Sequence, residues 1–193
     1  IVGRGGLLLR EHRKVAQNQN NSPLAAGQEI NERVAEVARI NARLHGVNAD
    51  IRSGDTLRAP QHIGETGLKQ FDLVVANPPM GLKAQKRDEI SDKSPDRFQF
   101  GPIGPRLDTA FLQHAVSSTS ESGRAALLIP PRLLSALRKE RKVMTGLLEA
   151  DLIEAVVQLP SGVLPNTSIA PALLLLNRSK DGDRQGRVLL ADA

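Results

Sequence analysis

The residues with the clearest chemical potential are Asn77, Pro78 and Pro79, which follow a short apolar run at 72–76. A proline fixes its own φ, lacks a backbone donor and holds the preceding residue in an extended conformation. The two prolines therefore form a stiff loop whose carbonyl oxygens no helix can consume. Together with the side-chain oxygen of Asn77, these carbonyl groups can accept hydrogen bonds from a ligand. The sequence thus predicts a site that binds a hydrogen-bond donor.

Three further sets of residues have types and spacing suited to a nucleotide-like cofactor. Gly3, Gly5 and Gly6 form a glycine-rich turn, which in doubly wound folds lets the backbone approach a cofactor. Glu29 follows about twenty residues later, where a carboxylate can accept hydrogen bonds from the two hydroxyls of a ribose. Asp55 ends a predicted strand. Structural interpretations stay open for each: a flexible terminus, an acidic residue that opens a helix, and a simple turn.

Composition excludes several other kinds of chemistry. Cysteine is absent, which rules out disulfides, thiolate metal sites and thiol nucleophiles, and the four histidines lack metal-ligand spacing. No apolar run approaches the length of a membrane-spanning helix. The net charge of +5 and the pI near 10.0 allow attraction to a polyanion. We therefore expect a cytoplasmic protein without a membrane partner, and 193 residues suit one domain.

The candidate residues lie at the ends of strands that alternate with helices. Apolar runs bounded by turn residues predict strands at 24–30, 50–55, 72–76, 124–129, 152–159, 169–176 and 187–190. Helical periodicity predicts helices at 7–15, 31–46, 108–120 and 133–148, the second one capped by Asn31. This alternation is typical of a doubly wound, mainly parallel α/β sheet, in which ligands bind at the carboxyl ends of strands. We expect the strand at 72–76 to be buried and central.

Seven short segments occur in a fixed order along nearly the whole chain. They are Gly3-Arg-Gly-Gly6, Gly27-Gln-Glu-Ile-Asn31, Gly54-Asp-Thr-Leu57, Asn77-Pro-Pro-Met-Gly81, Asp108-Thr-Ala-Phe-Leu-Gln-His114, Leu159-Pro160 and Asn166-Thr-Ser-Ile169. Together they resemble the motifs of N6-adenine DNA methylases, in particular the modification subunits of type I restriction systems. The resemblance implies a seven-stranded, mainly parallel sheet of the S-adenosylmethionine-dependent methyltransferase (Rossmann-like) type. It also implies an antiparallel strand near the end, for which residues 152–176 contain the candidate pair.

The resemblance also assigns roles to individual residues. S-adenosylmethionine would be bound by Gly3, Gly5, Gly6, Glu29, Ile30, Asp55 and Thr56. The catalytic residues, which would receive an adenine of DNA, are Asn77, Pro78, Pro79 and Met80. No metal ion is implied. His114 would be a buried structural residue, because the family packs its helix beside the active site.

The implied reaction explains why two acceptors are needed. The exocyclic amine of adenine is a poor nucleophile, because its lone pair is delocalised into the ring. Acceptors on Asn77 and Pro78 would bind its N–H groups and turn the lone pair toward the methyl sulfonium. The absence of cysteine excludes the thiol addition that is used to methylate ring carbons. A paired adenine cannot reach such a loop, so it must be flipped out of the duplex at a cost of roughly a few kcal/mol.

Two residues depart from the family pattern. Arg4 stands where relatives usually carry serine, and it places a bulky cation beside the methionine end of the cofactor. Met80 stands where relatives carry an aromatic residue that stacks on the flipped base. Stacking contributes roughly 1–3 kcal/mol per base, whereas methionine offers dispersion and sulfur–π contacts. We expect a loss of about 1 kcal/mol, or roughly five- to tenfold in rate or binding, unless Phe98 or Phe100 supplies the aromatic face.

The resemblance further implies a larger assembly. Residues 1–193 would be a methyltransferase catalytic domain, with a helical domain and the first strand preceding Ile1. DNA recognition would come from a separate specificity subunit, with a restriction subunit as a further partner, and Lys83, Lys86 and Arg87 could contact phosphates. Two alternatives stay open: a catalytically impaired subunit that acts as a scaffold, and an enzyme that methylates an RNA base or a protein glutamine. The segments at 108–114 and 159–169 favour the DNA family.

Overall fold

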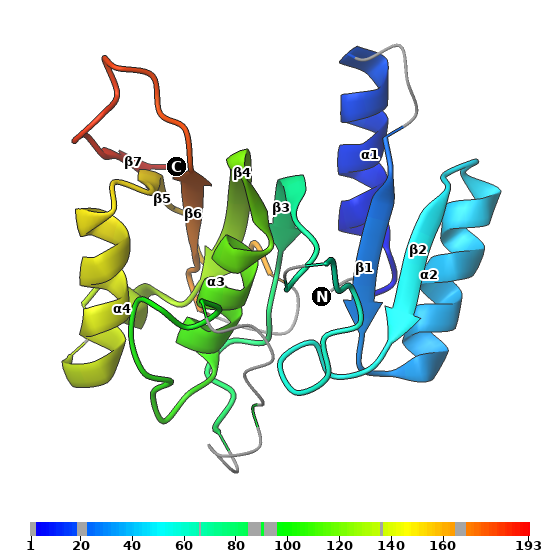
Figure 1. Ribbon diagram of the computed structural model, residues 1–193, viewed down its shortest axis with the longest axis horizontal. Coiled ribbons are helices and arrows are strands. Elements are labelled where there is room, and N and C mark those ends of the chain that lie inside the picture. The colour runs from blue at the N-terminus through cyan, green and yellow to red at the C-terminus, as the bar shows by residue number, and fades with distance from the viewer. Residues whose placement is uncertain are drawn as a thin grey trace. The chain divides into compact units, whose positions relative to one another are not determined.

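The computed structural model describes residues 3–18, 23–65, 67–84, 90, 96–135, 137–164 and 169–193. The chain divides into two compact units, Ile1–Leu68 and Lys69–Ala193. The first unit holds α1 (Gly6–Asn18), β1 (Ala25–Glu29), α2 (Glu32–Leu44) and β2 (Ala49–Ser53) (Figure 1). The second holds β3 (Phe71–Ala76), α3 (Asp108–Ser117), β4 (Thr119–Ile129), the 3-10 helix η2 (Pro131–Leu133), α4 (Arg138–Glu149), β5 (Ile153–Gln158), β6 (Ala172–Asn177) and β7 (Leu189–Asp192).

In the first unit, a pair of parallel strands is covered by helices. Glu29, the last residue of β1, pairs with Ser53, so both strands end at the same edge. Helix α2 begins where the sequence predicted, because the side chain of Asn31 accepts a hydrogen bond of 3.3 Å from the Val34 amide. The core of this unit consists of Leu9, Ala25, Ala35, Ala38, Ala42, Val47 and Ile51. The three alanines lie on α2, and their small side chains let the helix approach the strands closely.

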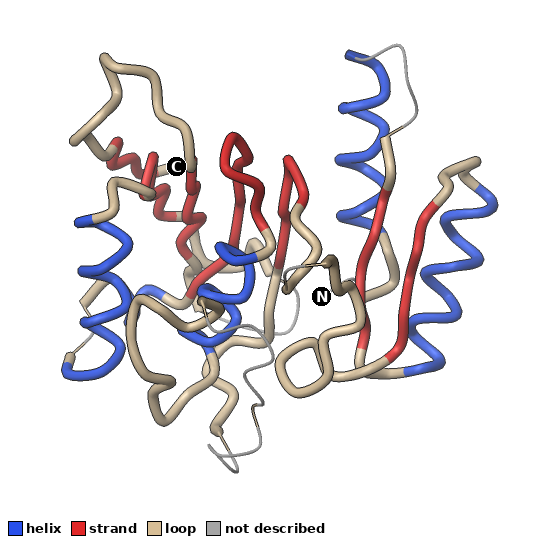
Figure 2. The backbone as a smooth tube through the Cα atoms, in the orientation of Figure 1, coloured by secondary structure: helices blue, strands red, loops and turns tan. Residues whose placement is uncertain are grey.

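In the second unit, five strands form one sheet in the order β3-β4-β6-β5-β7 (Figure 2). β6 runs antiparallel to both of its neighbours, whereas β3–β4 and β5–β7 are parallel pairs. Residues from β4, β5, β6, α3, η2 and α4 build the core, in which Leu112, Leu127, Leu133, Leu147 and Leu174 are fully buried.

The sheet differs from the expected one in two respects and agrees with it in a third. The described strands form a two-stranded and a five-stranded sheet, not a single, mainly parallel sheet of seven. The expected antiparallel pair within residues 152–176 is confirmed as β5–β6. The strand at 72–76 was expected to be buried and central, but β3 is an edge strand of its sheet. Because β4 is its only strand partner there, Leu73 is 41% exposed.

Several element boundaries also differ from the sequence prediction; β4, for example, begins at Thr119 and not at residue 124. Helix α3 ends at Ser117, because the hydroxyls of Ser118 and Thr119 donate hydrogen bonds of 2.8 Å to the last-turn carbonyls of His114 and Ala115. The helix expected at 133–148 begins only at Arg138, after the 3-10 turn that starts at Pro131. Among the residues that the structure describes, no helix combines the length and apolar character needed to cross a membrane.

Candidate functional site

Glu29 joins the three segments of the first unit that were predicted to hold a cofactor. Its Oε2 accepts a hydrogen bond of 3.1 Å from the Gly3 amide, and its Oε1 accepts one of 3.0 Å from the Asn31 amide. Its backbone carbonyl accepts a third, of 2.9 Å, from the Gly54 amide. Only 8% of Glu29 is exposed. One buried residue thus links the glycine turn, the start of α2 and the turn after β2.

Gly3 and Gly5 have different roles in the turn. Gly3 and Gly5 have φ angles of +56° and +87°, in the left-handed region that favours glycine. A Cβ on Gly5 would lie 3.4 Å from Ala38, so Gly5 allows α2 to pack against the turn. A Cβ on Gly3 would meet no atom within 4 Å. The backbone at Gly3 is therefore open to a ligand, whereas Gly5 serves packing.

Helix α1 begins at Gly6, directly after this turn. Its first turn contains no acidic side chain that would neutralise the positive end of the helix dipole. Arg4 is exposed, and its carbonyl oxygen accepts a hydrogen bond of 3.0 Å from the Asn41 side chain on α2. The backbone of the turn is thereby held, and a positively polarised helix end lies beside an exposed arginine. Such a place suits a carboxylate.

Asp55 makes most of its contacts within its own turn. One carboxylate oxygen accepts hydrogen bonds from the Leu57 and Arg58 amides at 2.9 and 3.2 Å, and the other accepts one of 2.6 Å from the Arg58 guanidinium. Partial burial favours a raised pKa for Asp55, but these hydrogen bonds outweigh it and the pKa is lowered. Thr56 is half-buried in the same turn, whereas the apolar Ile30 is 68% exposed. The turn interpretation of Asp55 thus has direct structural support.

In the second unit, the double-proline loop follows β3 and presents two free acceptors. Asn77 and Pro79 are exposed, Pro78 is buried and Met80 is half-buried. No described residue donates a hydrogen bond to the Asn77 side chain or to the Pro78 carbonyl oxygen. Both predicted acceptors therefore lack a donor among the described residues, and the side chain of Asn77 is on an exposed residue.

The far end of this loop is clamped at Gly81, a feature that sequence reasoning missed. The Gly81 amide donates a hydrogen bond of 2.9 Å to Oδ1 of Asp108, and its carbonyl accepts one of 2.9 Å from Arg106. Gly81 has a φ of +71°, and a Cβ there would lie 3.0 Å from the Arg106 guanidinium. Oδ2 of Asp108 pairs with Arg132, which also contacts both oxygens of Glu140 at 3.1 Å. An acidic residue in the first turn of a helix usually interacts with its own helix, so no sequence signal pointed to this clamp.

Helix α3 also holds the segment that precedes it. The Gln113 side chain accepts a hydrogen bond of 3.0 Å from the Phe100 amide and donates one of 3.1 Å to the Gly101 carbonyl. Nδ1 of His114 accepts a hydrogen bond of 3.1 Å from Arg97, which places the ring proton on Nε2. Burial, and then the nearby charge of Arg97, lower the pKa of His114 to about 3. The polar residues at 108, 113 and 114 thus act as anchors, as expected for His114.

Phe98 and Phe100 both make contacts within the second unit. Phe100 packs against the main core, and a Cβ on Gly146 of α4 would lie 3.2 Å from its ring. The Arg97 guanidinium lies 4.8 Å from the centre of the Phe98 ring and covers that ring. The predicted contact of Met80 with a base stays a prediction.

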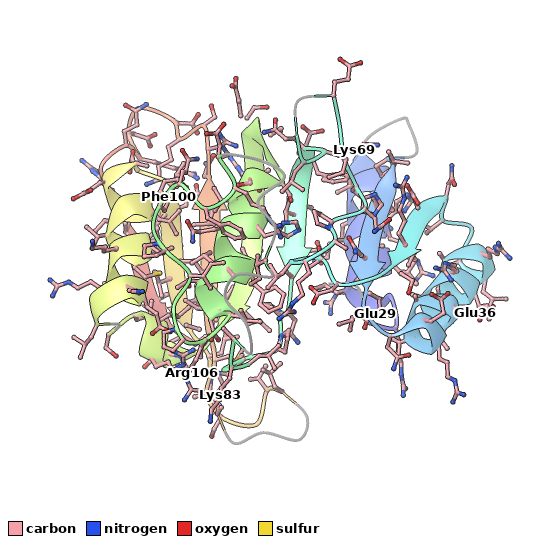
Figure 3. All side chains as sticks on the ribbon, turned by 60° about the horizontal axis from the view of Figure 1, so that its bottom comes forward. Glu29, Glu36, Lys69, Lys83, Phe100 and Arg106 are labelled. Atoms are coloured by element: carbon pink, nitrogen blue, oxygen red, sulfur yellow. The ribbon has the colours of Figure 1, made fainter. Side chains whose placement is uncertain are left out.

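Several expectations concern residues outside the described ranges. Lys86, Arg87 and residues 166–168 lie there, so their predicted roles stay predictions. Lys83 is described: it is exposed and forms an isolated antiparallel bridge with Arg106, beside which it lies in Figure 3. The described part of the chain holds no cluster of three or more potential metal ligands.

Comparison with known proteins identifies relatives along the whole chain. The family model N-6 DNA Methylase matches residues 1–193. The HindI methylase subunit of a type I restriction enzyme from Haemophilus influenzae is 30% identical over 198 residues, which cover 100% of this chain and 43% of that protein. The solved methyltransferase subunit of a type I restriction-modification system from Streptococcus thermophilus superposes with a TM-score of 0.86 at 30% identity, covering 99% of this chain and 40% of the other.

A more distant structural relative supports the fold alone. A structure from Listeria monocytogenes, assigned to the class I S-adenosylmethionine-dependent methyltransferases, has a TM-score of 0.76 at 17% identity and covers 98% of this chain and 55% of the other. The chain spans less than half the length of the type I relatives described above. These comparisons confirm the α/β fold class that was expected from the sequence. The described strands nevertheless form two sheets and not the expected single sheet of seven.

Proposed function

The chain belongs to the N-6 DNA methylase family, and we propose that it is the catalytic domain of an enzyme that methylates adenine N6 in DNA. The observation that carries this proposal is the pair of acceptors on Asn77 and Pro78, to which no described residue donates a hydrogen bond, in a loop held at both ends. These oxygens would bind the two N–H groups of a flipped adenine and direct the nitrogen lone pair away from the ring. The new N–C bond would replace the methyl–sulfur bond of the sulfonium donor, which would leave as the thioether S-adenosylhomocysteine, and one amine proton would be released to water.

The residues of the first unit fit S-adenosylmethionine, which supplies an electrophilic methyl group on its sulfonium. Each carboxylate oxygen of Glu29 accepts one backbone hydrogen bond, so lone pairs remain for the ribose hydroxyls. The open backbone at Gly3 and the start of α1 at Gly6 suit the carboxylate of the methionine part. The exposed Ile30 offers an apolar surface to the adenine ring.

The remaining members of the proposed cofactor set have narrower roles. Gly5 keeps the turn close to α2, and Thr56 lies in the turn at the end of β2. Asp55 uses both oxygens within that turn, so it would meet the cofactor only through remaining lone pairs. In this proposal, the residues of the first unit would bind the cofactor and those of the second unit would bind the base.

We also propose that this domain works within a type I restriction-modification complex. Its relatives are named methylase subunits of type I restriction enzymes, and the chain corresponds to less than half of their length. A specificity subunit would select the DNA sequence, and a restriction subunit would be a further partner. The net charge of +5 favours binding to DNA.

The test offers three substrates to the complete methylase subunit, purified with the subunits that accompany it. Plasmid DNA, ribosomal RNA and a peptide-release factor are incubated with cofactor labelled in the methyl group, and calorimetry measures cofactor binding separately. We expect label in DNA, on adenine N6. Label in RNA or on a protein glutamine would support the second alternative. Absence of cofactor binding would support the scaffold.

A further inference from the structure

Asp108 directs its carboxylate away from its own helix. The N-cap of α3 is Leu107, which makes no side-chain cap, and Asp108 lies in the first turn. One of its oxygens accepts the Gly81 amide and the other pairs with Arg132. Arg132 belongs to η2, and its second partner, Glu140, belongs to α4. The charged side chains of Asp108, Arg132 and Glu140 therefore connect Gly81, at the end of the double-proline loop, to η2 and α4.

Stability alone is a poor explanation for this arrangement. Asp108 is only 5% exposed, and the cost of removing a carboxylate from water often cancels the attraction within a buried ion pair. Replacing a whole buried ion pair by apolar groups of similar volume is frequently neutral or stabilising, whereas removing one partner is destabilising. In some proteins a buried ion pair fixes the geometry of the atoms that it contacts. Here the contacted atom is the Gly81 amide nitrogen, 2.9 Å away.

The two prolines stiffen the loop internally, and contacts at its two ends hold it against the rest of the unit. At its start, Ala76 pairs with Leu127 of β4. At its end, Gly81 is held by Asp108 and Arg106. Between these points lie the residues that carry the two acceptors, and neither acceptor is tied to the rest of the described chain. The next residue, Leu82, also accepts a hydrogen bond of 2.8 Å from the Leu107 amide, so loss of the Asp108 contact would shift the two acceptors rather than free them.

We propose that Asp108 is a positioning residue for methyl transfer, which places the Asn77 and Pro78 oxygens by fixing Gly81, with Arg132 and Glu140 orienting its carboxylate. This inference rests on the proposed function. A displacement of about 1 Å at a reacting group can lower a rate about 10²-fold. The effect should fall on kcat, because the residues proposed to bind the cofactor belong to the other unit.

The experiment compares Asp108→Ala, Asp108→Asn and a matched control, Asp151→Asn. Asp151 has the same kind of contacts as Asp108: a cation, Lys180 at 2.6 Å, and a glycine amide, Gly186 at 2.9 Å. It lies in the turn between α4 and β5, far along the chain from the loop. Measurements on the complete subunit are kcat, KM for DNA, Kd for the cofactor, and hydrogen exchange at the Gly81 amide.

For Asp108→Ala we expect a fall in kcat of roughly 10- to 100-fold, an unchanged cofactor Kd and faster exchange at Gly81. Asp108→Asn keeps an acceptor oxygen for the Gly81 amide and should recover part of kcat, which a purely structural role would not predict. Asp151→Asn should lower the unfolding temperature and leave kcat unchanged. If Asp108→Ala does not fold, Asp108→Asn and Arg132→Met provide the same comparison.

Failure of this inference can be told apart from failure of the proposed function. An active wild-type enzyme whose Asp108 variants keep full kcat, although Gly81 exchanges faster, would overturn the positioning role. A fall in kcat equal to that of Asp151→Asn would do so as well. A wild-type subunit that binds the cofactor but methylates no substrate would instead refute the proposed function.

Discussion

The carboxylate of Glu29 lies 3.1 Å from the backbone nitrogen of Gly3, across 26 positions of the sequence. The acidic residue at the end of β1 thus closes the glycine turn before any ligand is bound. A carboxylate that must hold a turn and also accept ribose hydroxyls has little freedom to move. The proposed cofactor site would therefore be preorganised around one buried side chain, Glu29.

Replacing Glu29 by glutamine should weaken cofactor binding. Glutamine keeps one acceptor oxygen but removes the charge, and a hydrogen bond to a charged group contributes roughly 1.5–3 kcal/mol. We expect the Kd for S-adenosylmethionine, measured by calorimetry, to rise roughly 10- to 100-fold. The control is Glu36→Gln, since Glu36 is an exposed residue of α2 in the same unit (Figure 3). Equal effects of the two substitutions would contradict the assignment.

Replacing Asn77 by alanine should abolish methyl transfer while cofactor binding persists. Because the side chain is exposed and has no partner in the described part of the chain, its loss should not change the unfolding temperature. Removing a group that stabilises developing charge typically lowers kcat by about 10²–10³. Transfer of labelled methyl groups to DNA measures the effect. Unchanged turnover would show that Asn77 does not contact the reacting amine.

Replacing Met80 by phenylalanine should increase the activity of the enzyme. The half-buried methionine offers no aromatic face, and Phe98 and Phe100 are engaged elsewhere. Stacking on the base should restore about 1 kcal/mol, which is roughly five- to tenfold in kcat/KM for DNA. Met80→Leu is the control, because leucine keeps the apolar contact without a ring. A gain in the leucine variant, or none in the phenylalanine variant, would argue against base stacking at this position.

The stability of the domain should fall as the pH decreases from about 7 to about 5, in part because of His114. Its pKa is about 3 in the folded protein, against an ordinary value of 6.5. Below the ordinary value, the unfolded chain binds a proton that the folded chain does not, so acid favours unfolding by up to ~1.4 kcal/mol per pH unit. The contribution of His114 to stability is fully present above its ordinary pKa of 6.5.

Urea unfolding across this range tests the assignment. His114→Gln should reduce the slope of the unfolding free energy against pH by the contribution of one proton. Asp55, Asp151 and Glu154 have lowered pKa values. Their contributions to stability are lost only as the pH falls through the ordinary carboxyl range and below. Above about pH 5, these carboxylates therefore do not mask the contribution of His114. Parallel curves for the wild type and the variant would contradict the assignment.

Much of this protein could be inferred from local features of its sequence. The helix start at Asn31, the alternation of strands and helices and the double-proline loop after a strand all depend on residues that are close in sequence. Steric limits on φ and ψ, side-chain caps and apolar periodicity act over such short separations. For this reason the positions of the candidate residues at strand ends were predictable.

Only the tertiary structure decided how these pieces meet. The clamp between Asp108 and Gly81 spans 27 positions, and the order β3-β4-β6-β5-β7 joins strands that are not consecutive. The use of Asp55 within its own turn depended on a competition between nearby donors that residue types alone do not settle. Contacts of this kind depend on where distant segments are packed, because a hydrogen bond forms only when its donor and acceptor are held at bonding distance. The sequence alone determined which groups were present and where the chain turned, and packing decided which of those groups hold the loop in place.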